Sequence, residues 1–306
     1  MLFFEKIKKI LKTGPLACTI IISCMAFFVF ECIYTNSLFR KNLVSLKEKI
    51  ISSDVFLNSD TNKTNVQTVT EAKTDEPSPE EIFIKPSDDP ENTKLIFPID
   101  EGVYTTVTKD YFDDALFIGD SRTISLELYG DWKNATYYTK QGISVWEILD
   151  DKFAKLSDGT PATLEEALKE KQFKKIYIML GVNELATGTS QTFKEQYKKV
   201  VDKIKELQPD ATIFIQSIIH VSKEKSDAEE FINNPTINER NIKLFSLADN
   251  KSVFFLDANE VLDDEQGALK KEYTFDGVHM TADYLYIYKD FLLKHGLKKL
   301  IPENVV

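Results

Sequence analysis

Residues 115–123 read Ala-Leu-Phe-Ile-Gly-Asp-Ser-Arg-Thr, and this stretch decides the expected fold. The apolar run from Ala115 to Ile118 has the length and bulk of a fully buried strand. A tight turn is expected next, because a glycine and a small hydroxyl residue follow, and Thr123 then opens a helical pattern. Such a turn places Ser121 at the carboxyl end of a sheet, near free helix N–H groups. Taken alone, these residues fit either an ordinary loop turn or a nucleophilic serine.

Apolar runs and helical patterns alternate along the rest of the chain. Strands are predicted at Ala115–Ile118, Ala135–Thr139, Lys175–Leu180, Ala211–Ile219 and Ser252–Asp257. Helices are predicted at Thr123–Tyr129, Val145–Phe153, Leu164–Glu170, Thr192–Leu207, Ile237–Ala248 and about Ala282–His295. The alternation predicts an α/β protein, a three-layer α/β/α sandwich with a five-stranded, mostly parallel sheet. In this architecture the loops that follow the strands form the functional site.

Composition excludes several classes of function. The formal net charge of −11 argues against a nucleic-acid-binding protein, which would need a basic face. All three cysteines lie within the first 32 residues, so the remainder has neither disulfides nor a cysteine metal site. Any mechanism that needs an imidazole has three candidates, His220, His279 and His295. We expect no metal ion and no cofactor.

An apolar segment at residues 16–34 predicts a transmembrane signal anchor, because it is about long enough to cross a bilayer as a helix. Lysines within residues 1–15 favour a cytoplasmic N-terminus and an extracellular remainder. Arg40 and Lys41 follow the segment and leave the reverse orientation open. Cleavage or lipidation is also left open, because Ile21-Ile22-Ser23-Cys24 resembles a lipoprotein cleavage box.

The composition changes again beyond the predicted anchor. Residues 35–94 are predicted to be a stalk and a disordered linker, since Ser, Thr, Asn, Asp, Glu and Pro dominate most of this stretch. The folded domain is predicted to cover residues 95–306.

Four short stretches could carry chemistry together, because each follows a predicted strand or precedes the last helix. They are residues 119–121 (Gly-Asp-Ser), 141–144 (Gln-Gly-Ile-Ser), 181–184 (Gly-Val-Asn-Glu) and 276–279 (Asp-Gly-Val-His). Acyl transfer at a serine needs a base for the hydroxyl proton, a carboxylate that orients the base, and N–H donors for the oxyanion.

Each of these roles has a candidate residue. Ser121 is the predicted nucleophile, His279 the base and Asp276 the orienting carboxylate. The backbone N–H groups of Ser121 and Gly142 and the side-chain amide of Asn183 are the predicted oxyanion donors. Glycine at position 142 lets the backbone approach a substrate without an intervening Cβ.

This set resembles the SGNH hydrolase superfamily, also called GDSL-type esterases. Its four name-giving residues match in chain order at Ser121, Gly142, Asn183 and His279, with Asp276 at the family's Asp-x-x-His position. The resemblance covers about 200 residues, from near residue 95 to residue 295. It implies a flavodoxin-like fold and a serine esterase or acyltransferase.

Two departures from the family pattern concern substrate choice. Arg122 and Thr123 replace the leucine of the GDSL name, and Glu184 stands where aspartate is commoner. Arg122, Glu184 and His220 are tentative substrate-binding residues. The alternatives are a salt bridge for Arg122, a supporting or helix-capping role for Glu184, and a hydrogen-bonded loop histidine for His220.

The expected function is serine-dependent ester hydrolysis or O-acyl transfer through an acyl-enzyme. The layout of anchor plus domain is similar to that of O-acetyltransferases of this superfamily, which implies acetyl esters of cell-envelope carbohydrate. Expected partners are a cell-surface glycan or small ester, the membrane through the N-terminal helix, and a multispanning membrane acyltransferase that supplies acyl groups. The alternatives are a lipase, lysophospholipase or thioesterase of the same superfamily, and a non-catalytic glycan-binding assembly factor.

Overall fold

The computed structural model describes residues 83–85, 94–98, 100 and 102–300. All of them belong to the second of the two units into which the chain divides, Lys73–Val306. The predicted N-terminus at 1–15, the signal anchor at 16–34 and most of the linker at 35–94 lie outside the described residues, so these assignments and the domain boundary at residue 95 stay predictions. Among the described residues, no helix has the length and apolarity to cross a membrane.

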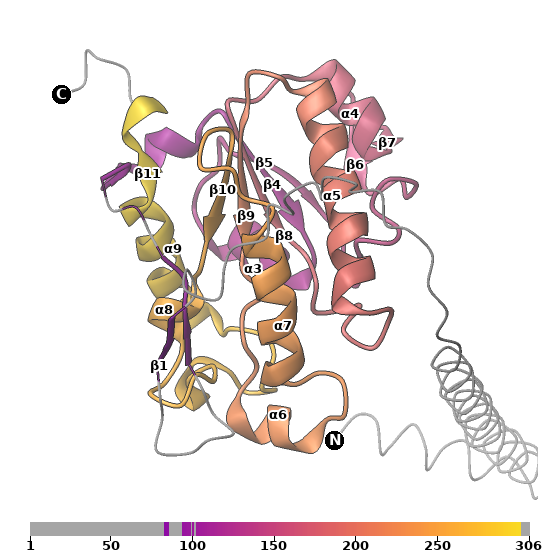
Figure 1. Cartoon of the computed structure of the whole chain (residues 1–306). Coiled ribbons are helices and arrows are strands. Elements are labelled where there is room, and N and C mark those ends of the chain that lie inside the picture. Colours follow the sequence, from indigo (N-terminus) through magenta and orange to yellow (C-terminus); the bar gives the residue numbers. More distant parts are fainter. Residues whose placement is uncertain (1–82, 86–93, 99, 101, 301–306) are drawn as a thin grey trace, which may run out of the picture. The chain divides into compact units, whose positions relative to one another are not determined.

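Five parallel strands form the central sheet (Figure 1), and every neighbouring pair in it is parallel. The strands are β4 (Ala115–Gly119), β5 (Thr136–Thr139), β8 (Lys175–Met179), β9 (Thr212–Gln216) and β10 (Val253–Leu256). Their order, β10-β9-β8-β4-β5, is the flavodoxin-like doubly wound order. The chain reverses its direction of winding between β4 and β8, which is where such folds form their sites. The predicted five-stranded parallel sheet is confirmed.

Three small antiparallel pairs lie outside this sheet in the described part of the chain. They join β1 (Phe83–Lys85) to β2 (Lys94–Ile96), β3 (Tyr104–Thr105) to β11 (Gly296–Leu297), and β6 (Ala154–Lys155) to β7 (Pro161–Ala162).

Helices cover both faces of the sheet (Figure 1). One face carries α4 (Leu164–Glu170), α5 (Ser190–Leu207) and α7 (Asn234–Phe245), and the other carries α3 (Ser121–Tyr129), α8 (Asn259–Leu262) and α9 (Leu285–Lys294). The remaining helical elements are α6 (Lys223–Ala228), η3 (Lys109–Phe112), η4 (Lys271–Tyr273), η5 (Ala282–Tyr284) and η6 (Lys298–Leu300).

Alternate strand residues supply the two cores. On β4, Leu116 and Ile118 join the cluster under α4, α5 and α7, whereas Phe117 joins the cluster under α3, α8 and α9. This alternation follows from the opposite directions of successive side chains on a strand. Because both faces are buried, β4 reads in the sequence as a continuous apolar run. The predicted three-layer arrangement is therefore confirmed.

Two helices of the α4/α5 layer begin at capping boxes. The Thr163 hydroxyl accepts the Glu166 backbone N–H and the Glu166 carboxylate accepts the Thr163 N–H, which starts α4. Thr189 and Thr192 make the same reciprocal pair at the start of α5. These contacts satisfy N–H groups that a helix leaves unpaired at its first turn.

The prediction of a helix at Val145–Phe153 is wrong: the chain makes a series of turns there. Ile148 N–H donates to the Ser144 carbonyl and Asp151 N–H to the Glu147 carbonyl, but these single turns do not join into a helix. Of the apolar residues that suggested a helix, Val145, Ile148 and Phe153 are buried. The spacing of the apolar residues therefore predicted burial but not the backbone path. The Val145 N–H donates to the Glu184 side chain of a different loop instead of to a helix carbonyl.

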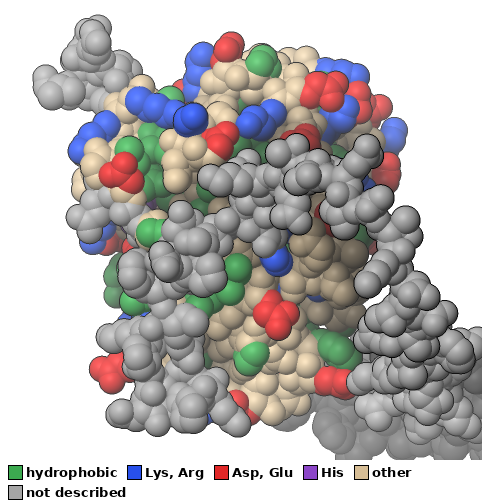
Figure 2. Space-filling model, in the orientation of Figure 1, with side chains coloured by type: hydrophobic (Ala, Val, Ile, Leu, Met, Phe, Trp, Pro, Cys, Tyr) green, Lys and Arg blue, Asp and Glu red, His purple; other side chains and the backbone are tan. Residues whose placement is uncertain are grey.

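The visible face carries charges of both signs (Figure 2). Lysine and arginine side chains lie mixed with acidic ones along its upper part. On α5, for example, Lys198 pairs with Asp202 one turn later at 2.7 Å. Exposed pairs of this kind contribute little to stability.

Gly119 ends β4 where there is no space for a side chain. A Cβ there would lie 2.1 Å from the Thr123 hydroxyl and 2.6 Å from the Met179 carbonyl oxygen, which belongs to the backbone of β8. We expect Gly119→Ala to lower the free energy of unfolding by about 2–3 kcal/mol, because the backbone must move. Urea unfolding followed by tryptophan fluorescence measures this loss, and an unchanged midpoint would contradict the packing argument.

Candidate active site

Ser121, His279 and Asp276 form a chain of hydrogen bonds. The Ser121 hydroxyl lies 2.9 Å from His279 Nε2, and His279 Nδ1 lies 2.7 Å from Asp276 Oδ2. The serine and the histidine are 158 residues apart in the sequence, so the fold brings them together. An imidazole with one nitrogen on a carboxylate and the other on a hydroxyl can take the hydroxyl proton.

The loop before α9 holds Asp276 rigidly. Its Oδ1 accepts the backbone N–H groups of Val278 and His279, both at 2.8 Å. Partial burial acts to raise the pKa of Asp276, but these backbone bonds and the His279 ring outweigh it and hold the pKa well below its usual range. Asp276 is therefore ionised at neutral pH and can stabilise a protonated imidazole.

Ser121 is the first residue of α3, at the end of β4. Asp120 caps this helix, because its Oδ1 accepts the Arg122 backbone N–H at 2.9 Å. Asp120 is 1% exposed, and this burial raises its pKa, which the nearby Arg122 charge partly offsets. The serine thus lies at the positive end of a helix, on the rim of the sheet.

Gly142 and Asn183 lie in the loops after β5 and β8. Gly142 has a φ of +76°, a conformation that favours glycine, and a Cβ built there meets no atom within 4 Å. Asn183 Nδ2 donates to the Ile143 carbonyl at 3.0 Å and to Asp120 Oδ2 at 3.3 Å. The bond to Asp120 joins the Asn183 loop to the turn that carries Ser121.

A family model, the GDSL-like Lipase/Acylhydrolase family, matches residues 117–283, more than half of the chain. The chain belongs to this family. The match begins within β4 and ends just after His279, so it spans all four loops described above. The predicted SGNH resemblance is confirmed, and this GDSL-like protein is a hydrolase by family.

Solved structures with similar folds include three from different organisms. A Streptococcus pneumoniae protein, provisionally described as a platelet activating factor, is 23% identical over 58% of this chain and 82% of its own, with a TM-score of 0.47. A GDSL-like lipase from Bacteroides thetaiotaomicron is 15% identical over 61% of this chain and 89% of its own, with a TM-score of 0.44. A carbohydrate esterase family 3 protein from Talaromyces cellulolyticus is 13% identical over 58% of this chain and 93% of its own, with a TM-score of 0.40. Likenesses this distant carry no conclusion about substrate. No curated protein matches the chain.

Arg122 of the GDSL-like domain points inward. It is 6% exposed, and its Nη1 donates to the Ile219 carbonyl in the loop after β9 at 2.6 Å. Burial lowers its pKa to about 10, although Asp120 and Asp276 act to raise it. Arg122 therefore ties α3 to the loop after β9, and its role in substrate binding stays a prediction.

His220 lies in a buried polar cluster apart from the Ser121 hydroxyl. Its Nδ1 bonds Asp263 at 2.7 Å and its Nε2 bonds Asn238 at 2.8 Å. Burial acts to lower its pKa, but Asp263 outweighs this and raises it. Both ring nitrogens are used within the protein, which favours the alternative interpretation of a hydrogen-bonded loop histidine.

Sequence reasoning missed two residues that shape the site. Asp120 both caps α3 and accepts from Asn183, and the signal for it was an acidic residue just before a helix start. Arg240 of α7 is 1% exposed and donates to carbonyls of the loop after β8. No sequence pattern pointed to it, because it lies within a mostly polar helical stretch.

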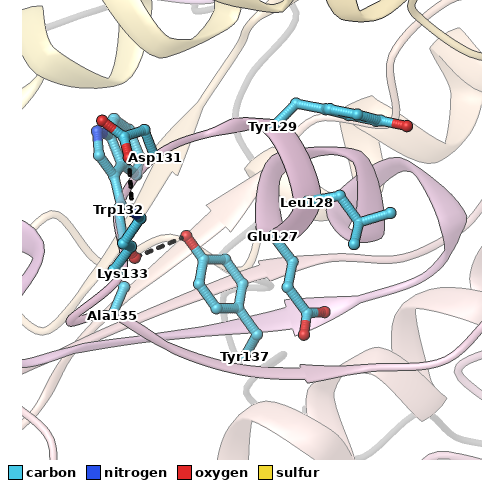
Figure 3. A pocket seen from close by; sticks show the side chains of 8 residues that line it. All are labelled: Glu127, Leu128, Tyr129, Asp131, Trp132, Lys133, Ala135 and Tyr137. Atoms are coloured by element: carbon cyan, nitrogen blue, oxygen red, sulfur yellow. Dashed lines mark hydrogen bonds and ion pairs between the residues drawn. The ribbon is translucent and has the colours of Figure 1, made fainter.

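A separate pocket of about 350 Å³ lies at the other end of α3 from Ser121 (Figure 3). Its lining includes Tyr129, Trp132 and Tyr137, and the Tyr137 hydroxyl donates to the Trp132 carbonyl. It contains no residue of the hydrogen-bonded chain, and we assign it no function. Among the residues that the structure describes, no cluster of His, Cys, Asp and Glu side chains could hold a metal ion.

Proposed function

We propose that this GDSL-like hydrolase is a serine esterase for small acyl groups, chiefly acetyl, on cell-envelope carbohydrate. The observation that carries the proposal is the hydrogen-bonded chain from the Ser121 hydroxyl through His279 to Asp276, with bonds of 2.9 and 2.7 Å. A binding protein without turnover would not need a nucleophile, a base and an orienting carboxylate together.

The first half of the reaction forms an acyl-enzyme. Ser121 Oγ attacks the ester carbonyl while His279 Nε2 takes the hydroxyl proton, and Asp276 stabilises the resulting imidazolium. When the bond between the acyl carbon and the sugar oxygen breaks, His279 donates this proton to the leaving sugar oxygen. The acyl group is then held on Ser121 as an ester.

The second half releases the acyl group. His279 takes a proton from a water molecule, whose oxygen attacks the acyl carbonyl, and the proton then returns to Ser121 as the carboxylic acid departs. A sugar hydroxyl in place of water would transfer the acyl group instead, so hydrolysis and O-acyl transfer use the same residues.

The tetrahedral oxyanion needs fixed N–H donors, for which we propose the backbone N–H groups of Ser121 and Gly142 and the side chain of Asn183. The left-handed backbone at Gly142 and its open surroundings support this role. For Asn183, the longer bond to Asp120 at 3.3 Å is the one that an oxyanion would replace.

The cavity beside the catalytic loop is small. A cavity of about 10 Å³ is lined by Arg122 and Ser125 of α3, by Val278 and Met280 on either side of His279, and by neighbouring residues. This volume is about that of one water molecule, so a long acyl chain could not enter there.

The place of action and the partners are part of the proposal. The predicted anchor and polar linker would hold the domain outside the cell at a reach of tens of ångströms, which suits a surface glycan. If transfer is the main reaction, a multispanning membrane acyltransferase would supply the acyl groups.

Hydrolysis of p-nitrophenyl esters by the full chain in detergent tests the proposal. We expect kcat/KM to be at least about tenfold higher for acetyl than for octanoyl ester, because the cavity beside the catalytic loop is too small for a long acyl chain. Acetylated sugar formed from an added chitooligosaccharide would assign transfer as well as hydrolysis. Preference for the octanoyl ester would favour the lipase alternative, and no turnover by the folded protein would favour the glycan-binding alternative.

A further inference from the structure

Glu184 connects two loops of the site. It follows Asn183 in the loop after β8, and its Oε1 accepts the backbone N–H of Val145 in the loop after β5 at 2.8 Å. The residue is 1% exposed, so the bond is shielded from water. The carboxylate therefore links the two loops.

Asn183 also bonds to this segment. Its Nδ2 donates to the Ile143 carbonyl at 3.0 Å, two residues before the N–H that Glu184 accepts. One donor and one acceptor from adjacent residues thus hold the segment 143–145. This segment directly follows Gly142, whose N–H direction depends on how the segment is held.

The loop that carries Glu184 is itself fixed from α7. Arg240 Nη2 donates to the carbonyls of Glu184 at 3.2 Å and Thr187 at 3.0 Å, and its guanidinium lies 4.5 Å from the centre of the Phe193 ring. These contacts leave the Glu184 carboxylate little freedom to turn away from Val145.

The charged and titratable groups that face Glu184 come from three other elements. Asp120 lies at the start of α3, Arg240 on α7 and Tyr197 on α5. Burial, together with the Asp120 charge, raises the pKa of Glu184 to about 7, although the Val145 N–H and Arg240 act to lower it. The carboxyl group therefore changes its protonation state near neutral pH.

We propose that Glu184 is a positioning residue, whose ionised carboxylate holds the 143–145 segment so that the Gly142 N–H and the Asn183 amide face the oxyanion. The inference rests on the proposed function, because it assumes that these two groups bind an oxyanion. A hydrogen bond to an ionised acceptor is about twice as strong as one between neutral groups. Protonation of Glu184 therefore loosens the hold on the oxyanion donors.

Glu184→Gln tests this role, because glutamine has the shape and acceptor oxygen of a protonated glutamate but never ionises. At pH 8 we expect its kcat for p-nitrophenyl acetate to be about tenfold below that of the wild type, with KM unchanged. As the pH falls through 7, the ratio of wild-type to variant kcat should approach one, because the wild type then becomes neutral at this position.

Glu147→Gln is the matched control. Glu147 lies in the same loop after β5. Its carboxylate accepts the Ser144 hydroxyl at 2.8 Å and makes no described bond to the backbone N–H of Val145. We expect its kcat ratio to the wild type to stay near one at every pH. A ratio for Glu184→Gln that does not vary with pH, or a raised KM with unchanged kcat, would overturn the positioning role.

Hydrogen exchange at the Val145 amide tests the same contact without activity. We expect faster exchange in Glu184→Ala than in the wild type, and unchanged exchange in Ser121→Ala. Equal exchange in Glu184→Ala and the wild type would overturn the inference. If the wild type shows no turnover that depends on Ser121, the proposed function fails, while the exchange measurement still decides whether Glu184 holds the loop.

Discussion

Ser121→Ala is expected to lower kcat for p-nitrophenyl acetate by about 10⁴-fold or more, because it removes the proposed nucleophile. The variant removes the hydroxyl oxygen that lies 2.9 Å from His279 Nε2 and that would form the acyl-enzyme. The backbone N–H of residue 121 and the Asp120 cap of α3 do not need the hydroxyl, so the fold should persist. Initial rates at saturating ester, with circular dichroism as the test of folding, measure the loss.

Ser125→Ala is the matched control for this prediction. Ser125 lies one turn further along α3, and its hydroxyl donates only to the Ser121 carbonyl, at 3.3 Å, among the bonds described for it. We expect its kcat to stay within about twofold of the wild type, because the bond that its hydroxyl makes is to a backbone carbonyl and not to His279 or Asp276. Comparable turnover by Ser121→Ala and Ser125→Ala would remove Ser121 from the mechanism.

Asp276→Asn is expected to lower kcat by about 10³- to 10⁴-fold while leaving the loop folded. The two backbone N–H groups that reach Asp276 Oδ1 should select the oxygen of the new amide. The amide nitrogen would then face His279 Nδ1 and donate to it. The ring proton of His279 is then on Nε2, so Nε2 cannot accept the proton of Ser121. The expected result is a large loss of kcat with little change in KM.

A second His–Asp pair provides the control. His220 Nδ1 lies 2.7 Å from Asp263, the same distance as in the pair of His279 and Asp276, but its Nε2 bonds Asn238 rather than a serine. We expect Asp263→Asn to lower stability, because it weakens a buried charge pair, and to leave kcat per folded molecule unchanged. Equal losses of kcat in the two aspartate variants would contradict the assignment of Asp276.

Much of the fold was predictable because local signals agree with the tertiary structure. The run that became β4 is apolar without interruption, since helices bury both of its faces. The chemistry-bearing stretches follow strands whose carboxyl ends share one edge of the sheet, so their convergence follows from the predicted topology. The short spacing of Asp276 and His279 likewise allowed their local hydrogen bond to be predicted.

The remainder depends on contacts between distant residues, which sequence patterns do not reveal. The segment after Gly142 has apolar residues at helical spacing, yet its backbone is held by Glu184 and Asn183 from another loop. His220 looked available for substrate, but Asp263 and Asn238, from two other elements, occupy its ring nitrogens. In both cases the deciding partner lies far along the chain.

Labelling with a fluorophosphonate, followed by intact-mass measurement and peptide mapping, tests the central claim most directly. An activated serine attacks such a reagent and keeps it as a stable adduct, without any choice of acyl group or acceptor. For the full chain we predict a single adduct on Ser121, its absence in Ser121→Ala, and much slower labelling in His279→Ala. A folded wild-type protein that takes up no label, or takes it up at another residue, would contradict the assignment of Ser121 as the nucleophile.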